Sequence, residues 1–208
     1  MSFLIQQKKL LLFCLFLLPL CLQAQTGSPV KPYRVRNIAW FTPSGASEIN
    51  GLAVGIQAIG VDFKPLRING LNADVGMLSM FMLPYAVHYH LSSSEKKAEA
   101  FMEYDSAMVI INGISLSMGG EQDATINGIN VAGGLTTAVS LNGISVSGLF
   151  TRSQQFNGIS IAGIHNYSFH GRGLQIGLIN HCRKLKGLQI GLWNKSGKRS
   201  LPFINWGF

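Results

Sequence analysis

One short phrase recurs along this chain at a fixed spacing of fifteen residues. Each regular copy joins an apolar residue to Asn-Gly-Ile and then to an alternating segment. The four regular copies are residues 111–116, 126–131, 141–146 and 156–161. The glycine register continues into two copies of Gly-Leu-Gln-Ile-Gly-Leu, which begin at Gly173 and Gly187. A short fixed period of this kind indicates one structural unit stacked on copies of itself.

Within each unit, apolar residues alternate with small polar ones, as in Ile144-Ser145-Val146-Ser147. A period of two indicates a β-strand with one apolar face and one small polar face. We expect the apolar face to point into the core and the serine face to point outward. The Asn-Gly pair before each strand tolerates positive φ, as a tight corner requires. Polar clusters such as residues 152–155 then mark a turn between successive strands.

Two architectures accommodate such a unit. In a β-solenoid each unit is one coil, and identical positions stack into ladders. In an antiparallel β-meander or outer-membrane β-barrel, each unit supplies one strand of about 9 to 11 residues and a turn. The slip to fourteen residues between Gly173 and Gly187 favours the solenoid, because a one-residue slip in tight hairpins would exchange the two faces. The sequence therefore predicts an all-β, single-domain β-solenoid of about 15-residue coils, with the antiparallel meander or barrel as the alternative.

The repeats predict how the chain is divided. Earlier copies of the phrase at Gly51 and Gly70 extend the β-repeat domain over residues 48–208. The forty-three residues between Gly70 and Gly113 leave room for three unmarked coils or an insertion, and we expect a loop or insertion near 84–107. Residues 25–47 are expected to form a lead-in and N-terminal cap. Residues 201–208, rich in Pro and aromatic side chains that cannot continue a parallel ladder, are expected to form the C-terminal cap.

The amino terminus has the pattern of a secretory signal peptide, residues 1–24. Two lysines precede an apolar run from Leu10 to Leu22, and Ala24 shortly after it is a small residue suited to cleavage. Lipidation at Cys21 and an uncleaved anchor are the alternatives. After cleavage Cys182 is the one cysteine left, so an internal disulfide cannot form. We expect the protein to be exported, to the cell surface, the outer membrane or the periplasm.

The charge is unevenly distributed along the chain. Asp123 is the last acidic residue, and eight basic residues follow it. The C-terminal half of the chain therefore carries only positive charge and attracts anions. This makes anionic lipid head groups or glycans possible partners. Nucleic acid does not suit an exported chain. Basic turns that serve only solubility are the alternative interpretation.

Residues with catalytic or metal-binding chemistry are few. His88 and His90 would share one face of a strand, as two metal ligands do, but no acidic or cysteine ligand lies near them. His181 and Cys182 would point to opposite sides of a strand, which separates a thiol from its base. Glu103 and Asp105 precede the regular repeats and are expected in a solvated region. The sequence therefore predicts no catalytic, metal or cofactor site and no enzyme.

The segments Gly-Leu-Gln-Ile-Gly-Leu-Ile-Asn (173–180) and Gly-Leu-Gln-Ile-Gly-Leu-Trp-Asn (187–194), with Pro-Phe-Ile-Asn near the end, resemble a family of bacterial surface repeat-containing proteins of spirochaetes and Bacteroidota. The resemblance covers residues 48–208, although the middle copies carry Ser or Asn in place of Gln. It implies export and association with the surface or outer membrane, and it supplies no catalytic residues. We therefore expect an exported, non-enzymatic structural or interaction module. The alternative is a small outer-membrane β-barrel with a structural or pore role.

Overall fold

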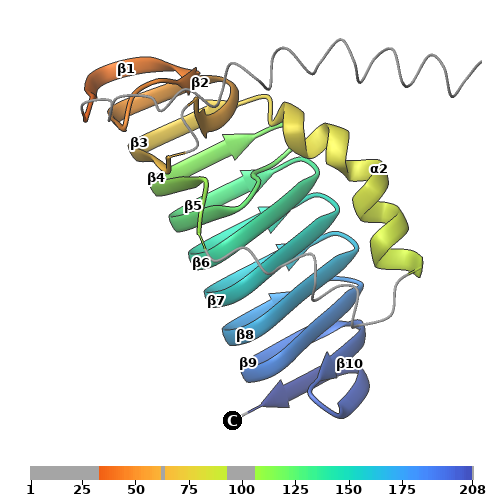
Figure 1. The fold of residues 1–208 in the computed structure, drawn as a ribbon. Helices are drawn as coiled ribbons and strands as arrows, with labels where there is room; N and C mark the ends of the chain where they lie inside the picture. The colour runs from red at the N-terminus through yellow and green to blue at the C-terminus, as the bar shows by residue number, and fades with distance from the viewer. Residues whose placement is uncertain (1–32, 62–63, 93–105, 208) are drawn as a thin grey trace, which may run out of the picture. The chain divides into compact units, whose positions relative to one another are not determined.

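The computed structural model describes residues 33–61, 64–92 and 106–207. These residues contain one ten-stranded sheet whose strands follow one another in chain order (Figure 1). The strands are β1 (Val35–Ser44), β2 (Glu48–Gly60), β3 (Leu66–Asp74), β4 (Val109–Ser117), β5 (Ala124–Ala132), β6 (Leu135–Ser147), β7 (Phe150–Ala162), β8 (His165–Ile176), β9 (Ile179–Ser196) and β10 (Arg199–Gly207). One helix, α2 (Met77–Ser92), lies between β3 and β4 in the sequence. The signal-peptide segment 1–24 and the residues Glu103 and Asp105 lie outside the described residues.

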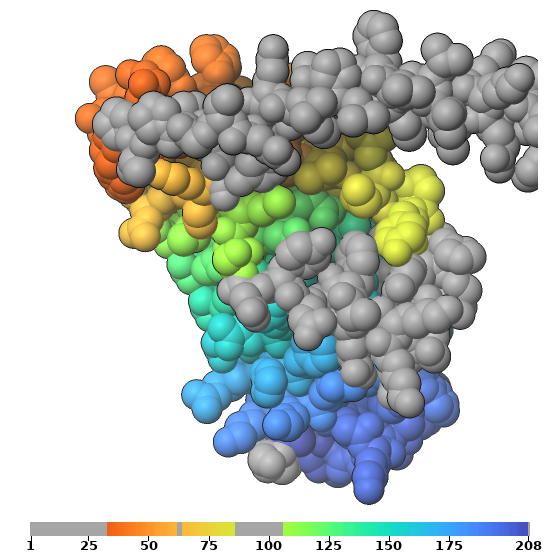
Figure 2. Space-filling view, in the orientation of Figure 1, coloured from red at the N-terminus to blue at the C-terminus, as the bar shows by residue number. Residues whose placement is uncertain are grey.

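The strands β1 to β9 pair in parallel, each with the next. The repeated phrase is aligned across them: Gly128 of β5 lies beside Gly113 of β4 and Gly143 of β6. Parallel neighbours that follow one another after about 15 residues are the coils of a β-solenoid of about nine turns. In the space-filling view the coils form successive layers in chain order (Figure 2). The predicted β-solenoid is confirmed, and the antiparallel alternative is wrong for these strands.

The single fourteen-residue unit is absorbed in a turn. Gly173 pairs with Gly187 and Ile176 with Ile190, in a register that runs from β8 to β9 without a break. The shorter spacing therefore removes a residue from the turn before Ile179 and leaves the strand faces unchanged, as expected of a coil.

The long interval between Gly70 and Gly113 is an insertion, because β3 pairs directly with β4 in unbroken register. It holds no unmarked coil of the sheet among the residues that the structure describes, and it begins with α2. Hydrogen bonds connect the helix to β2 and to the turn between β4 and β5, and Leu83 packs against Leu135 and Phe150. The Leu78 amide donates to Gln57 (2.9 Å), and Gln122 donates to the hydroxyl of Ser79 (3.1 Å). The expected strand at 88–90 is wrong, because this segment belongs to the helix.

A row of glycines forms the corner of the stacked coils, and each glycine is needed for two reasons. Gly143, for example, has φ of 124°, a conformation that L-residues with a Cβ rarely adopt. A Cβ at Gly143 would also lie 2.1 Å from the carbonyl oxygen of Gly128 in the preceding coil. The repeat of Asn-Gly therefore reflects both the backbone angle at the corner and the close approach of neighbouring coils.

The side chains that point into the coil differ in polarity before and after each glycine corner. Before the corner the inward side chains are apolar, as Ile111, Ile126 and Leu141 are buried. After the corner the inward side chains are polar, and Ser115 and Asn130 are fully buried. The expectation that the serine face points outward is therefore wrong. The alternation was correctly identified, but the apolar residues of that segment are the ones that face solvent.

Buried polar side chains are tolerated because they hydrogen-bond to one another. Some bonds join neighbouring coils: Asn130 donates to Ser145 (3.0 Å) and Gln189 donates to Gln175 (2.8 Å). Others cross the interior of one coil, as between Ser160 and Asn166 (2.9 Å). The polar column after the corner thus has partners both along the stack and on the opposite wall.

A second polar ladder lies at the corner itself, where the asparagines before the glycines stack. Each side-chain amide nitrogen donates to the amide oxygen of the preceding coil, at 2.7–3.2 Å. The ladder consists of Asn37, Asn50, Asn69, Asn112, Asn127, Asn142 and Asn157. It ends where Arg172 replaces asparagine on β8.

Substitution in this ladder is expected to cost stability according to position. Asn127→Ala removes a donor to Asn112 and an acceptor for Asn142, whereas Asn37→Ala at the end of the ladder removes one bond. At about 1 kcal/mol per bond, we expect Asn127→Ala to cost roughly 2 kcal/mol and Asn37→Ala roughly half of that. Urea unfolding of the two variants measures the difference. Equal losses of stability in the two variants would show that the number of ladder hydrogen bonds does not set the free energy of unfolding.

The last strand closes the described sheet in a different way. A turn at Gly197, with φ of 57°, reverses the chain, and β10 pairs antiparallel with β9. The register shifts between Leu201 and Phe203, on either side of Pro202, which has no amide proton to donate. The described residues of 201–208 therefore run antiparallel to β9 and add a strand to the sheet.

Candidate functional site

The largest unexplained surface of the described chain is the outward side of the strands after the glycine corner. On β2 to β9 the side chains one and three positions after each corner glycine point outward. Their register partners on β1 and β10 extend them into two columns across all ten strands. The first column is Ala39, Leu52, Leu71, Ile114, Ile129, Ile144, Ile159, Leu174, Leu188 and Trp206. The second is Phe41, Val54, Ala73, Leu116, Val131, Val146, Ile161, Ile176, Ile190 and Ile204. Every member is apolar, and we call the two columns the apolar face.

The apolar face is flat and regular, because the side chains repeat in register. Ile114, Ile129 and Ile144 each expose 42% of their surface, so the same part of each side chain remains open in successive coils. At about 4.8 Å per strand, the face is roughly 43 Å long and 10 Å wide, or about 400 Å². Continuous apolar patches of this size on a protein are often functional. The sheet therefore offers an interaction surface rather than a set of scattered exposed residues.

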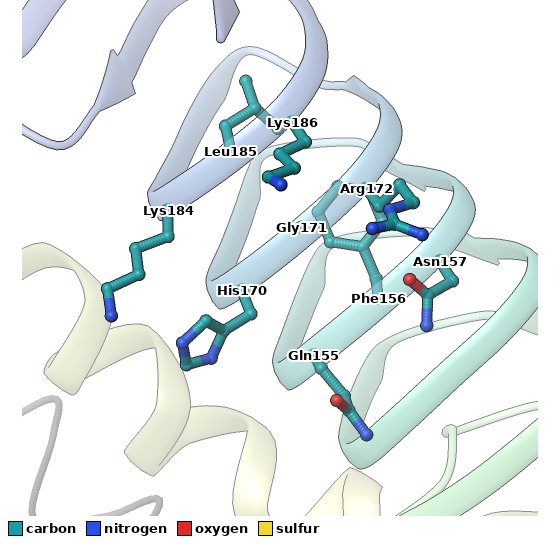
Figure 3. A pocket seen from close by; sticks show the side chains of 9 residues that line it. All are labelled: Gln155, Phe156, Asn157, His170, Gly171, Arg172, Lys184, Leu185 and Lys186. Carbon is teal, nitrogen blue, oxygen red and sulfur yellow. The ribbon is translucent and has the colours of Figure 1, made fainter. Parts of the chain in front are cut away.

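A basic hollow borders the apolar face at its C-terminal end. Two outward rows on β7, β8 and β9 change there from neutral to basic residues: Gln155, His170 and Lys184 form one row, and Asn157, Arg172 and Lys186 the other. Figure 3 shows the two rows running side by side across the strands. They line a hollow of about 490 Å³, which we call the basic hollow.

The inner wall of this hollow comes from the buried row between the two basic rows. There Gly171 takes the inward position that Phe156 and Leu185 hold on the neighbouring strands. The ring of Phe156 occupies the space over Gly171, where a Cβ would lie 2.2 Å from a ring carbon. The hollow is therefore part of a packed wall and does not lead into the core.

Two acidic side chains are buried in the polar column. Glu121 is fully buried and accepts hydrogen bonds from Ser115 (2.6 Å) and Asn72 (2.9 Å). Burial, and then the neighbouring Asp74, raise the pKa of Glu121 to about 8. Burial also raises the pKa of Asp74. Glu121 is therefore a neutral acid at pH 7, and its burial keeps it from reaching a substrate in solution.

Among the residues that the structure describes, the sequence candidates His181 and Cys182 do not form a reactive pair. Cys182 is fully buried, and burial raises the pKa of its thiol to about 12, so the thiolate needed for attack is not formed. His181 is its neighbour on β9 and contacts the ring of Tyr167 instead (4.9 Å between ring centroids). His88 and His90 lie in α2 and not on one strand face. No group of three or more His, Cys, Asp or Glu suited to a metal ion occurs among the residues that the structure describes.

Burial also changes the pKa of a histidine on β8, His165. His165 is close to His181 and Arg152. Desolvation by burial, followed by electrostatic interaction with these two side chains, lowers the pKa of His165 to about 4. His165 is therefore neutral at physiological pH and serves packing.

The sequence analysis did not find the apolar face, although one signal for it was present. The row that was expected to face water, two positions after each glycine, contains no charged residue from Asn72 to Asn205. A solvated row on a basic protein would carry lysine or arginine. The uncharged Ser, Asn and Gln of this row indicate an interior polar column, which leaves the apolar row outside.

No protein-family model, curated protein or solved structure matches the chain. Within the described residues, no helix has the length and apolar character needed to cross a membrane. The function must therefore be inferred from the protein's own surfaces.

Proposed function

We propose that this protein is an exported, non-enzymatic interaction module that docks onto a lipid surface through the apolar face. The signal-peptide pattern of residues 1–24 supports export. The buried state of Glu121 and Cys182 supports a role other than catalysis. The observation that carries the proposal is the unbroken pair of apolar columns from β1 to β10.

The dimensions of the apolar face favour a lipid surface over a second copy of the chain. Two such faces packed together would bury about 800 Å² in total, whereas stable protein interfaces bury roughly 1,200–2,000 Å². This minimum buried area does not apply to a membrane, because a lipid surface is larger than the protein and can cover the whole apolar face. Burial of about 400 Å² at about 25 cal/mol per Å² gives roughly 10 kcal/mol before the costs of association. That is enough for reversible peripheral binding.

Polar substitutions on the apolar face are expected to weaken vesicle binding. In the double variant Ile114→Gln/Ile129→Gln, two adjacent side chains of the first column become polar, and each loses part of its transfer free energy. We expect binding to phosphatidylcholine vesicles to fall at least about ten-fold. Co-flotation of the mature chain with vesicles measures the effect.

A matched control lies on the same two strands. Ile110→Gln/Thr125→Gln introduces the same residue four positions earlier, in an outward row on the other side of the corner. This control should bind vesicles as the unsubstituted chain does, and thermal unfolding should confirm that both variants fold. Equal loss in the control, or vesicle binding that survives in the face variant, would refute lipid docking by this face. Concentration-dependent dimerisation that the face variant abolishes would identify a second copy as the occupant instead.

A further inference from the structure

The basic hollow gathers cations where the repeat would otherwise place neutral residues. Arg172 pairs with Lys186 across β8 and β9, and His170 pairs with Lys184 across the same strands. Neighbouring strands are about 4.8 Å apart, so these side chains form a compact two-by-two group. All four side chains are exposed, and none of them forms an ion pair with another described residue. Like charges directly opposite one another on a sheet are destabilising unless an anion compensates them.

The cations also replace a stabilising feature. From β1 to β7 the position before the corner glycine is asparagine, and each of these asparagines donates to the one before it. Arg172 and Lys186 end this ladder in two successive coils. The row of Ser140 and Gln155 changes to His170 and Lys184 in the same coils. In both rows, the side-chain hydrogen bonds between neighbouring coils therefore stop where the hollow begins. A surface that only contacts water would not need to lose these bonds.

The chemistry of the hollow suits a phosphate group. The guanidinium of Arg172 offers planar paired donors, and lysine ammonium groups supply further charge. No acidic residue follows Asp123, so no carboxylate from β5 to the end of the chain competes for these cations.

The hollow also lies beside the apolar face. Arg172 precedes Leu174 by two residues on β8, and Lys186 precedes Leu188 by two residues on β9, with only the corner glycine between them. Long basic side chains can place their charge at the head-group level while their neighbours contact the apolar region. This order of cation and apolar residue matches the order of phosphate and acyl chain in a phospholipid.

We infer that the basic hollow binds the phosphate of an anionic phospholipid whose acyl region contacts the C-terminal end of the apolar face. The inference rests on the proposed lipid docking and adds a head-group preference to it. Basic residues near an anionic membrane surface each contribute to such binding. Arg172 and Lys186 are the residues that hold the phosphate, and His170 and Lys184 form the other side of the hollow.

The test uses the double variant Arg172→Asn/Lys186→Asn, which restores the asparagine of the repeat and is expected to extend the ladder beyond Asn157. Its fold should therefore be at least as stable as that of the unsubstituted chain. Binding to vesicles of phosphatidylcholine with phosphatidylglycerol should fall about ten- to thirty-fold. Binding to pure phosphatidylcholine vesicles should change little, because the choline ammonium of each lipid neutralises its phosphate and the apolar face is intact.

The charge-matched control is Arg67→Asn/Lys198→Asn, which removes one arginine and one lysine that are exposed elsewhere on the chain. This variant should lose less than about two-fold on the anionic vesicles. Equal losses in the two double variants would overturn the inference, because they would show attraction by net charge alone. Unchanged binding of the Arg172→Asn/Lys186→Asn variant would also overturn it.

Two further measurements are needed. One distinguishes a lipid phosphate from a soluble phosphate, and the other tests the head-group site separately from docking by the apolar face. Glycerol phosphate, added at constant ionic strength, should compete only weakly with anionic vesicles; tight binding of the soluble compound would overturn the lipid assignment. The Ile114→Gln/Ile129→Gln variant should lose binding to both kinds of vesicle. Suppose that the Arg172→Asn/Lys186→Asn variant binds phosphatidylglycerol vesicles as the unsubstituted chain does, while the Ile114→Gln/Ile129→Gln variant loses binding. The head-group site is then wrong, and docking by the apolar face stands.

Discussion

Gly143→Ala is expected to prevent the mature chain from folding stably at 37 °C. The added Cβ would lie 2.1 Å from the carbonyl oxygen of Gly128, and this atom belongs to the backbone of the preceding coil. The residue would also have to keep a φ of 124°, and left-handed conformations cost an L-residue roughly 1–2 kcal/mol. Relief of the overlap requires the two coils to separate, which breaks ladder hydrogen bonds on both sides. We expect a total loss of at least about 4 kcal/mol.

A loss of this size is a large part of the stability of a single domain, which is typically about 5–15 kcal/mol. Circular dichroism and thermal unfolding of residues 25–208 measure it. Gly45→Ala provides the control, because nothing lies within 4 Å of a Cβ at that position and its φ is not in the left-handed region. The control should unfold within a few degrees of the unsubstituted chain. A stable Gly143→Ala variant would show that the glycine row is not required by the stacking of the coils.

Glu121→Gln is expected to stabilise the protein at pH 8 and to flatten its dependence on pH. The pKa of Glu121 is about 8 in the folded protein and 4.5 as a free group. The folded state therefore keeps a proton that the unfolded state has released, and stability falls as pH rises through this interval. Glutamine has the same shape, remains neutral, and can still accept the hydrogen bonds from Ser115 and Asn72.

The window from pH 6.5 to 8 isolates this effect. His165 acts in the opposite direction, because its folded pKa of about 4 makes stability fall as pH drops below the ordinary histidine value of 6.5. The raised pKa of Cys182, about 12, affects stability only above its ordinary value of 9. Between pH 6.5 and 8 one retained proton is worth about 2 kcal/mol of unfolding free energy. Burial also raises the pKa values of Asp74 and Asp123, so their contribution to the pH dependence has the same sign as that of Glu121.

Urea unfolding at several pH values in this window measures the slope. Glu48→Gln is the matched control, since Glu48 is half-buried and accepts a hydrogen bond from Asn69 (2.8 Å) that glutamine can also accept. The control should retain the full slope. If Glu121→Gln has the same slope as the unsubstituted chain, Glu121 does not hold its proton in the folded state.

The predictable part of the fold came from positions where backbone geometry restricts the residue type. The glycine row is visible in the sequence because no other residue suits both the positive φ and the contact between coils, as at Gly128 and Gly143. The asparagine ladder is visible for a related reason, since identical amides hydrogen-bond when coils stack in register. The length of the repeated unit follows from these two rows, and the slip of one residue favours coils, but the parallel pairing itself is given by the structure.

The helix between β3 and β4 was less predictable. Its sequence from Met77 has no regular apolar stripe and contains Pro84, so neither a helical period nor a strand period is clear. The contacts of Leu78 with Gln57 and of Ser79 with Gln122 attach it to the coils. Such contacts depend on partners that are distant in the chain.

The sequence by itself predicted a repeated short unit with a glycine corner, favoured stacked coils over an antiparallel meander, and located the excess of basic residues after Asp123. Only the tertiary structure decided which side of each strand is inside. An alternation of Ile and Ser has the same period whichever residue is buried, and transfer free energy alone favours burial of the isoleucine. In the folded coil, Asn130 and Ser145 are buried because polar partners face them along the stack and across the coil, as Thr136 faces Asn130 (3.1 Å). The isoleucines are thereby left outside, where they form the apolar face.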